Sequence, residues 1–135
     1  MINLKENILY ISFDGMTDPL GQSQVLPYLS GLSKNYTFHL ISFEKPERFK
    51  QQEKLIRELC EKNNIEWHPI PYSTSPKGIS NLYNVRKMIK KAKELEKIHN
   101  FKIIHCRSYI SALVGLKFKQ KHKKKFLFDM RGFWA

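Results

Sequence analysis

The amino-acid sequence predicts an α/β protein with a parallel β-sheet that is covered by helices on both faces. Short apolar segments rich in strand formers alternate with longer segments of helical periodicity, and this alternation repeats five times. The first apolar segment, residues 8–13, is almost continuously hydrophobic, as is typical of a strand buried on both faces. The chain has 135 residues, a length that suits a single domain.

Five short strands are expected in this sheet. They are placed at residues 8–13, 36–43, 65–70, 102–106 and 126–130. The two halves of a doubly wound sheet run outward from its first strand. We therefore expect all strands to be parallel, in the order 3-2-1-4-5.

Four helices are expected between the strands, because apolar residues recur there at helical spacing. They cover about residues 25–32, 46–63, 80–99 and 108–119. Ser23 is a candidate N-cap of the first helix, and Pro27 is expected to disturb that helix because proline removes a backbone hydrogen bond. The buried stripe of the second helix is expected to contain Phe49, Leu55, Ile56, Leu59 and Cys60.

The charge of the chain is strongly positive and uneven. Lys and Arg number 24 against 12 Asp and Glu, a formal net charge of +12, and the excess lies beyond residue 40. Basic residues cluster in the predicted helix 80–99 and in the segment 117–125. Such clusters are either solvated surface or attract an anionic membrane, a phosphorylated small molecule or nucleic acid. Nucleic acid is less favoured, since no aromatic residues for base stacking are interleaved.

Several classes of protein are excluded by composition. The two cysteines, Cys60 and Cys106, form no C-x-x-C pair, so neither a disulfide framework nor a zinc knuckle is expected. No apolar run approaches the ~20 residues that span a bilayer. Lys5, Glu6 and Asn7 stand where a signal peptide would be apolar. A cytoplasmic protein with reduced thiols is therefore expected.

Ligands of an open parallel sheet bind at the carboxyl ends of its strands. This rule selects residues 14–24, 43–46, 107–109 and 131–134. The first of these loops contains Gly15 and Gly21 but neither a Walker A nor a G-x-G-x-x-G motif. Either the loop binds an anion at the start of the following helix, or its glycines serve packing alone.

Two arginines follow the fourth and fifth predicted strands. Arg107 shares a strand face with His105, and Arg131 shares one with Asp129 and precedes Gly132, which permits close backbone approach. A guanidinium suits phosphate or carboxylate, although an ion pair of Arg107 with Asp129 is the structural alternative. His105 is either a base or hydrogen-bond donor, or a buried histidine satisfied by the backbone.

No metal site is expected from the sequence. The chain has three aspartates, none in a D-x-D pattern, and its glutamates fall mainly on predicted helices. A pair of catalytic carboxylates or a cage of oxygen ligands is therefore not indicated.

Several segments together resemble the N-terminal half of a family 4, group 1 glycosyltransferase. The resemblance covers nearly the whole chain and keeps the order of its elements. The matching segments are Ile8–Asp14, Asp18–Gln24, Ile41–Pro46, His105–Ser108 and Phe128–Trp134.

This resemblance implies a GT-B enzyme, in which two Rossmann-like domains face each other across a cleft. The N-terminal domain mainly receives the acceptor, and the C-terminal domain mainly binds the nucleotide sugar. Transfer retains anomeric configuration, with no cofactor and no bound metal, since the nucleotide sugar is a substrate. Residues 1–135 would then be the acceptor-side domain, inactive without the missing donor-binding domain. A glycan or lipid-linked acceptor in polysaccharide synthesis, at the inner face of the cell membrane, would be the partner.

The resemblance also suggests roles for individual residues. Gly21 and Gln22 would approach the donor diphosphate. Arg107 and Arg131 lie near strand ends where many relatives have a histidine, and they are the candidate catalytic residues. Candidates for donor or acceptor binding further include Asp14, His105, Ser108, Asp129 and Gly132. The alternative to a transferase is a stand-alone, flavodoxin-like binding module whose basic surface holds nucleic acid or a protein partner.

Overall fold

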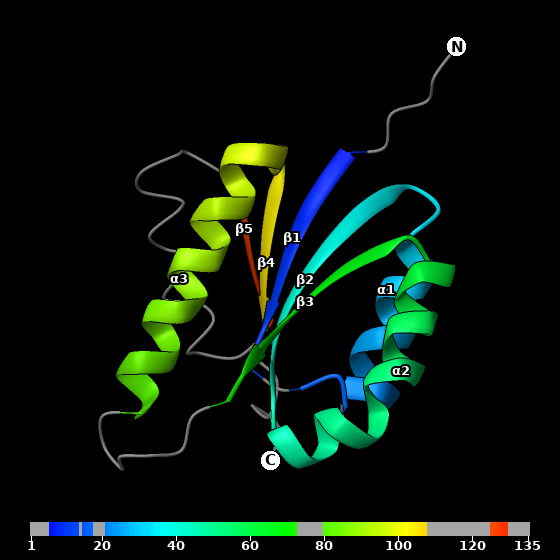
Figure 1. Ribbon diagram of the computed structural model, residues 1–135. Coiled ribbons are helices and arrows are strands. Elements are labelled where there is room, and N and C mark those ends of the chain that lie inside the picture. Colours follow the sequence, from blue (N-terminus) through cyan, green and yellow to red (C-terminus); the bar gives the residue numbers. More distant parts are fainter. Residues whose placement is uncertain (1–5, 14, 18–20, 73–79, 108–124, 130–135) are drawn as a thin grey trace.

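A parallel five-stranded sheet forms the centre of the structure, which is a computed structural model describing residues 6–13, 15–17, 21–72, 80–107 and 125–129 (Figure 1). The strands are β1 (Glu6–Ser12), β2 (Tyr36–Glu44), β3 (Ile65–Pro71), β4 (Ile103–Arg107) and β5 (Lys125–Asp129). Their order is β3-β2-β1-β4-β5, and every neighbouring pair is parallel. The predicted fold class, a Rossmann-like doubly wound sheet, and the predicted strand order are confirmed.

The central position of β1 explains why its sequence is continuously apolar. Leu9 and Ile11 belong to the hydrophobic core on one face of the sheet, and Ile8 and Tyr10 belong to the core on the other. Successive side chains of a strand point to opposite faces, so a strand with two covered faces needs apolar residues throughout.

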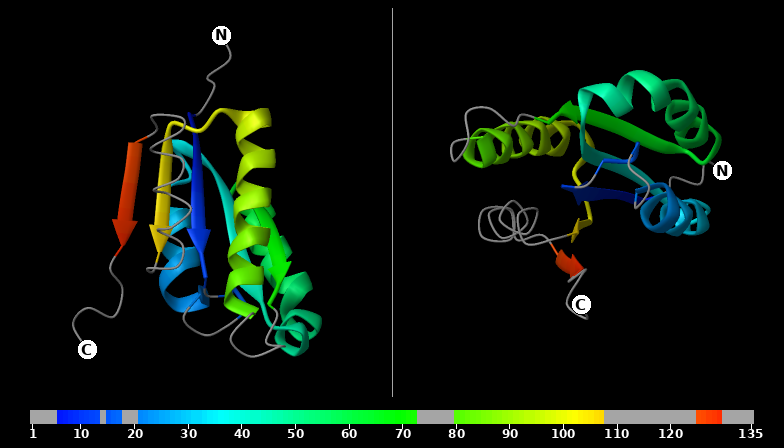
Figure 2. Two further views of the ribbon diagram at one scale, coloured as in Figure 1. Left: turned by 90° about the vertical axis from the view of Figure 1, so that its left-hand side faces the viewer. Right: turned by 90° about the horizontal axis from the view of Figure 1, so that it is seen from below.

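Helices cover both faces of the sheet. They are α1 (Leu26–Leu32), α2 (Pro46–Lys62) and α3 (Ser80–His99). Figure 2 shows α1 and α2 on one face and α3 on the other. The fourth predicted helix, over residues 108–119, lies outside the described residues.

The first helix begins differently from the prediction. A π-helical turn, Gly21–Val25, precedes α1, so Ser23 lies inside helical backbone and is not the N-cap. Pro27 stands in the first turn of α1, where backbone N–H groups have no partner within that helix. Its missing N–H therefore removes no hydrogen bond within α1, and the irregular π-helical turn lies directly before it.

The second helix buries a narrower stripe than predicted. Ile56 and Cys60 are buried one turn apart and Phe49 is partly buried, whereas Leu55 and Leu59 are 48% and 38% exposed. Residues 55 and 59 lie about 100° around the helix from 56 and 60. Because α2 packs at the β3 side of the sheet, no further strand or helix among the described residues covers Leu55 and Leu59.

Asparagines end α2 and α3 in the left-handed backbone region. Asn64 has φ 57° and Asn100 has φ 49°, and asparagine tolerates this conformation better than most side chains. The N–H of Asn100 donates to the carbonyl oxygen of Glu96 at 3.0 Å, which closes the last turn of α3. The chain then turns sharply into β4, and His99 is held at the edge where the strands begin.

Cys60 and Cys106 are buried and are not joined in a disulfide. Burial raises the pKa of Cys60 to about 12, so its thiol stays protonated at neutral pH. Among the described helices, none is both long enough and apolar enough to cross a bilayer.

Candidate functional site

The buried carboxylate of Glu44, the last residue of β2, holds the loop that follows β1. Oε1 of Glu44 accepts hydrogen bonds from the Thr17 N–H at 3.0 Å and the Thr17 hydroxyl at 2.7 Å. Oε2 accepts from the Met16 N–H at 2.8 Å and from the Ser42 hydroxyl. The side chain is 2% exposed. Four donors therefore compensate the loss of hydration that burial of this charge entails.

The same network extends across the sheet to β3. The indole Nε1–H of Trp67 donates to the Ser42 hydroxyl at 2.9 Å, and that hydroxyl donates in turn to Glu44. Successive hydrogen bonds of this kind polarise one another, which strengthens each of them in a low-dielectric interior. The position of the loop after β1 is thus tied to β2 and β3 at once.

The two glycines of this loop are required by close packing. A Cβ at Gly15 would lie 2.6 Å from the carbonyl oxygen of Phe43 and 2.7 Å from Oε1 of Glu44. A Cβ at Gly21 would lie 2.7 Å from the Cα of Met16. Backbone therefore presses on backbone at both positions. Both glycines therefore serve packing, and anion binding by this loop stays a prediction.

The predicted site residues that the structure describes lie at the carboxyl edge of the sheet. Gly21 and Gln22 open the π-helical turn, and the Gln22 amide donates to the carbonyl oxygen of Thr17 at 3.3 Å. His105 and Arg107 end β4, and Asp129 ends β5. Asp14, Ser108, Arg131 and Gly132 lie outside the described residues, as does the side chain of Asp129.

His105 is enclosed by aromatic rings. Its ring centroid lies 4.5 Å from that of Tyr10 on the neighbouring strand and 5.8 Å from that of Tyr28 on α1. The side chain is 7% exposed. This environment favours the interpretation of a buried histidine over that of a base exposed to substrate.

Arg107 stands between two neighbours at the strand ends. It is in register with Ser12 of β1 on one side and with Asp129 of β5 on the other. Residues in register on parallel strands lie on the same face of the sheet. Arg107 is 6% exposed, so it places a positive charge just beneath the surface of this edge.

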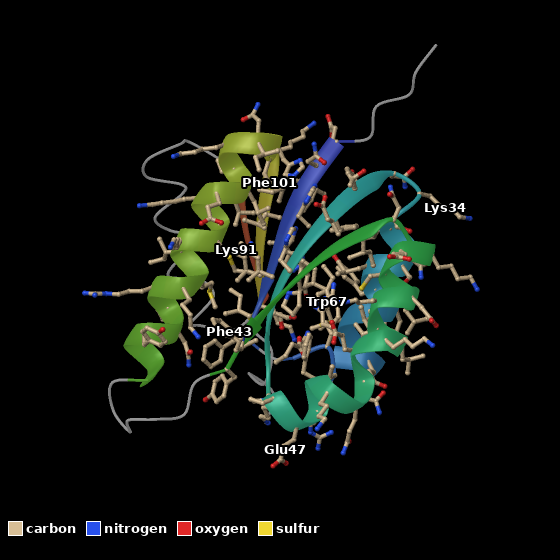
Figure 3. All side chains as sticks on the ribbon, viewed as in Figure 1. Lys34, Phe43, Glu47, Trp67, Lys91 and Phe101 are labelled. Atoms are coloured by element: carbon tan, nitrogen blue, oxygen red, sulfur yellow. The ribbon has the colours of Figure 1, made fainter. Side chains whose placement is uncertain are left out.

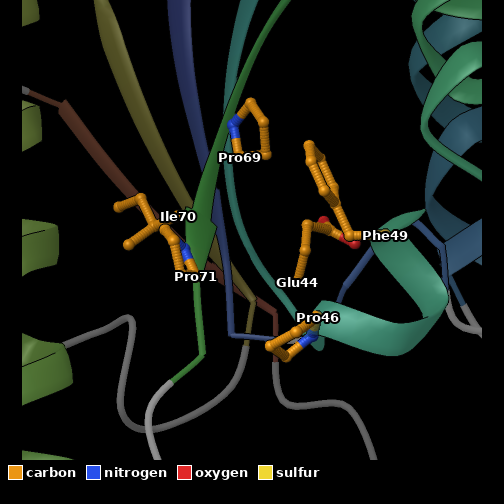
Figure 4. A pocket seen from close by; sticks show the side chains of 6 residues that line it. All are labelled: Glu44, Pro46, Phe49, Pro69, Ile70 and Pro71. Atoms are coloured by element: carbon orange, nitrogen blue, oxygen red, sulfur yellow. The ribbon is translucent and has the colours of Figure 1, made fainter.

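A small cavity adjoins the Glu44 network on the side of β3 (Figure 4). Its volume is about 200 Å³, and its lining is mostly apolar. The lining residues are Glu44, Pro46, Phe49, Pro69, Ile70 and Pro71. Residues 43–46 were expected at the ligand edge, but no role was expected for Glu44. An acidic residue directly after an apolar strand was the signal for it.

Comparison with known proteins identifies the fold but no sequence family. No protein-family model and no curated protein matches this sequence. Solved structures do match. Two crystal structures of the C-terminal domain of PF1911 hydrogenase from Pyrococcus furiosus superpose with TM-scores of 0.66 and 0.65, at 14% and 12% sequence identity. Each match covers 96% of both chains. At such low identity the likeness shows a shared fold alone.

Replacing Glu44 tests the network. In Glu44→Gln, an amide NH₂ replaces one of the two carboxylate oxygens that accept hydrogen bonds in the wild type. At least one buried donor therefore loses its partner. We expect the free energy of unfolding in urea to fall by about 2–4 kcal/mol. Glu58→Gln, at an exposed position of α2, is the matched control and should change it by less than about 0.5 kcal/mol. Equal stability of the two variants would contradict the role of Glu44.

Alanine substitution of two glycines tests the packing of the loop. Gly21→Ala should lower the free energy of unfolding by about 2 kcal/mol or more, because the backbone of Gly15 and Met16 must move. Gly31→Ala has no atom within 4 Å of the added Cβ and lies in α1. It should be neutral or stabilise by up to about 1 kcal/mol. The packing argument fails if thermal melts show the two variants to be alike.

Proposed function

We propose that this chain is the acceptor-side domain of a retaining GT-B glycosyltransferase. The observation that supports the proposal best is the arrangement at the carboxyl edge. The strand order reverses between β1 and β4, and this is the point at which doubly wound sheets bind ligands. The described parts of the segments that resemble glycosyltransferases include the ends of β1, β2, β4 and β5, which meet at this edge.

The fixed loop after β1 suits such a role. A transferase of this type needs a surface on which the acceptor and the donor diphosphate meet in a defined geometry, because misplacement of reacting groups is costly in rate. The Glu44 network and the two close-packed glycines hold residues 15–17 in one conformation. Such a loop needs no reorganisation when a ligand arrives.

Arg107 is the described residue best suited to act on phosphate at this edge. Guanidinium groups bind phosphate through two parallel hydrogen bonds, and their charge stabilises a diphosphate leaving group. Its position at the end of β4, beside β1, puts that charge next to the fixed loop. Arg131 follows the next strand and is proposed to share this role.

The outward face of α3 supports a lipid-linked acceptor. Arg86, Lys90 and Lys97 are exposed and lie on one side of this helix. Lys87 differs, because its ammonium donates to the carbonyl oxygen of Pro71 at 2.9 Å. A basic face of this kind is attracted to anionic lipid, and each residue close to the surface contributes about 1 kcal/mol.

Sugar transfer by the protein expressed from its full gene tests the proposal. A panel of nucleotide sugars is offered with a polyprenyl-diphosphate-linked sugar as acceptor. Arg107→Lys keeps the charge but loses the two-pronged geometry, so the transfer rate should fall on the order of 100-fold while the melting temperature barely changes. Arg57→Lys, on exposed α2, is the control and should transfer at the wild-type rate. A melting temperature that falls in proportion to activity would assign Arg107 a structural role. Absence of transfer with tight binding to RNA would favour the flavodoxin-like binding module.

Vesicle sedimentation tests the basic face of α3. Reversing Arg86, Lys90 and Lys97 to Glu should lower partitioning onto phosphatidylglycerol vesicles at least about 100-fold, and binding of the wild type should fade with salt. Reversing Lys50, Lys54 and Lys62, which are exposed on α2, changes the net charge equally and is the matched control. If both triple variants lose vesicle binding equally, or if the wild type binds neutral vesicles as well as anionic ones, the basic face of α3 is not a specific membrane-binding surface.

A further inference from the structure

Histidine side chains gather at the opposite, amino-terminal edge of the sheet. His39 of β2 lies between His68 of β3 and His99 at the end of α3, with ring centroids 6.1 Å and 3.9 Å away. Phe101, labelled in Figure 3 where α3 ends, closes one side at 5.2 Å from the His39 ring. The carboxylate of Glu66, also on β3, completes the group. Neither the proposed transferase nor the hydrophobic core uses these polar groups.

Hydrogen bonds fix which nitrogen of His39 carries its proton. The Asn7 amide Nδ2 donates to the carbonyl oxygen of His99 at 3.4 Å, which leaves Asn7 Oδ1 to act as an acceptor. His39 Nε2 lies 3.1 Å from that oxygen. Nε2 therefore holds the proton and donates to Asn7, so the lone pair of the neutral ring is on Nδ1.

Nδ1 of His39 lies close to another acceptor. Oε2 of Glu66 lies 3.0 Å from Nδ1, and Nδ1 is buried with no hydrogen-bond donor directed at it. His39 is 1% exposed. With its proton on Nε2, the electron pair of Nδ1 and a carboxylate oxygen lie at short range. This geometry calls for a cation between them.

We propose that His39, Glu66 and His99 bind one divalent transition-metal ion of the zinc type. One ligand atom from each residue lies within 4.8 Å of the others. Ligand atoms in a tetrahedral zinc site with bonds of about 2.0–2.1 Å are separated by roughly 3.4 Å. Glu66 is exposed and His99 is half-buried, so both side chains have room to adjust toward an ion.

The ligand atoms and their surroundings determine which metal ion this site prefers. Two imidazoles and a carboxylate suit zinc and its neighbours, whereas magnesium and calcium take mainly oxygen ligands. The hydrogen bond from His39 Nε2–H to the Asn7 carbonyl oxygen is the outer-shell contact that metal-bound histidines usually make. Because Glu66 is exposed, water can take the fourth position, and His68 stands next to it with Nε2 at 3.8 Å from Oε1 of Glu66.

A metal ion at this place would join three elements that are distant in the sequence. His39, Glu66 and His99 come from β2, β3 and the end of α3, so only the folded chain offers the site. Binding should therefore stabilise the fold by linkage. The site is at the edge opposite to the proposed ligand edge, so it would act on stability and leave the transfer chemistry to the other edge.

Calorimetric titration of the protein with zinc chloride tests the proposal, after removal of metal with EDTA and of any histidine tag. We expect one zinc ion per chain, bound with a Kd of about 1 μM or tighter, and a melting temperature raised by about 5 °C or more. Cobalt(II) should give the visible absorption of a tetrahedral site, and magnesium should have no effect.

Variants decide whether the named residues hold the ion. Glu66 is exposed and His99 is half-buried, so Glu66→Gln and His99→Gln should keep the fold, and each should weaken zinc binding at least about tenfold. His39→Asn should abolish it, with circular dichroism as the check of folding. Glu94→Gln, exposed on α3, is the control and should bind as the wild type. A Kd weaker than about 1 mM, or zinc affinity unchanged in both Glu66→Gln and His99→Gln, would overturn the proposal.

Discussion

The burial of one charge, the Glu44 carboxylate, is the constraint on which the carboxyl edge of the sheet depends. A buried carboxylate is tolerated only when its oxygens are fully engaged, and here Ser42, Met16 and Thr17 supply the donors. The position of the loop after β1 is therefore fixed relative to β2. Gly15 and Gly21 allow this, since any side chain at either position would meet backbone. The geometry of the edge is thus set within the domain itself, before any ligand binds.

The strands and their order could be predicted because they depend on local and general rules. Apolar runs mark strands covered on both faces, and the crossover rules for parallel sheets leave few arrangements of five such strands. The stripe of α2 was predicted less well. Helical periodicity places Leu55 and Leu59 near Ile56, but the extent of the sheet beneath a helix is not encoded in that periodicity. The start of α1 was missed because a π-helical turn has no sequence signature comparable to an N-cap.

The candidate site was predicted in its location and only partly in its residues. Arg107 and His105 could be placed at the edge because they end an apolar segment. Glu44 stands out in the sequence only as an acidic residue after an apolar strand. Its role could not be assigned, because its loop partners Met16 and Thr17 are 28 and 27 residues away and share no spacing motif with it. The same holds for His39, Glu66 and His99, which the fold brings together from three elements. The expectation of no metal site weighed the spacing of the aspartates and the position of the glutamates, which fall mainly on helices, whereas the proposed site draws on two histidines and a strand glutamate.

Two prolines give the outer strand β3 a further property. The N–H of Tyr72 donates to the carbonyl oxygen of Glu44 at 2.9 Å, so even-numbered residues at the end of β3 direct their backbone N–H toward β2. Pro69 and Pro71 therefore occupy positions where the N–H would face outward. Neither proline removes a hydrogen bond from the sheet, but both remove backbone N–H donors from its exposed edge. An incoming strand from another chain cannot continue the ladder there, which protects the protein from edge-to-edge aggregation on this side.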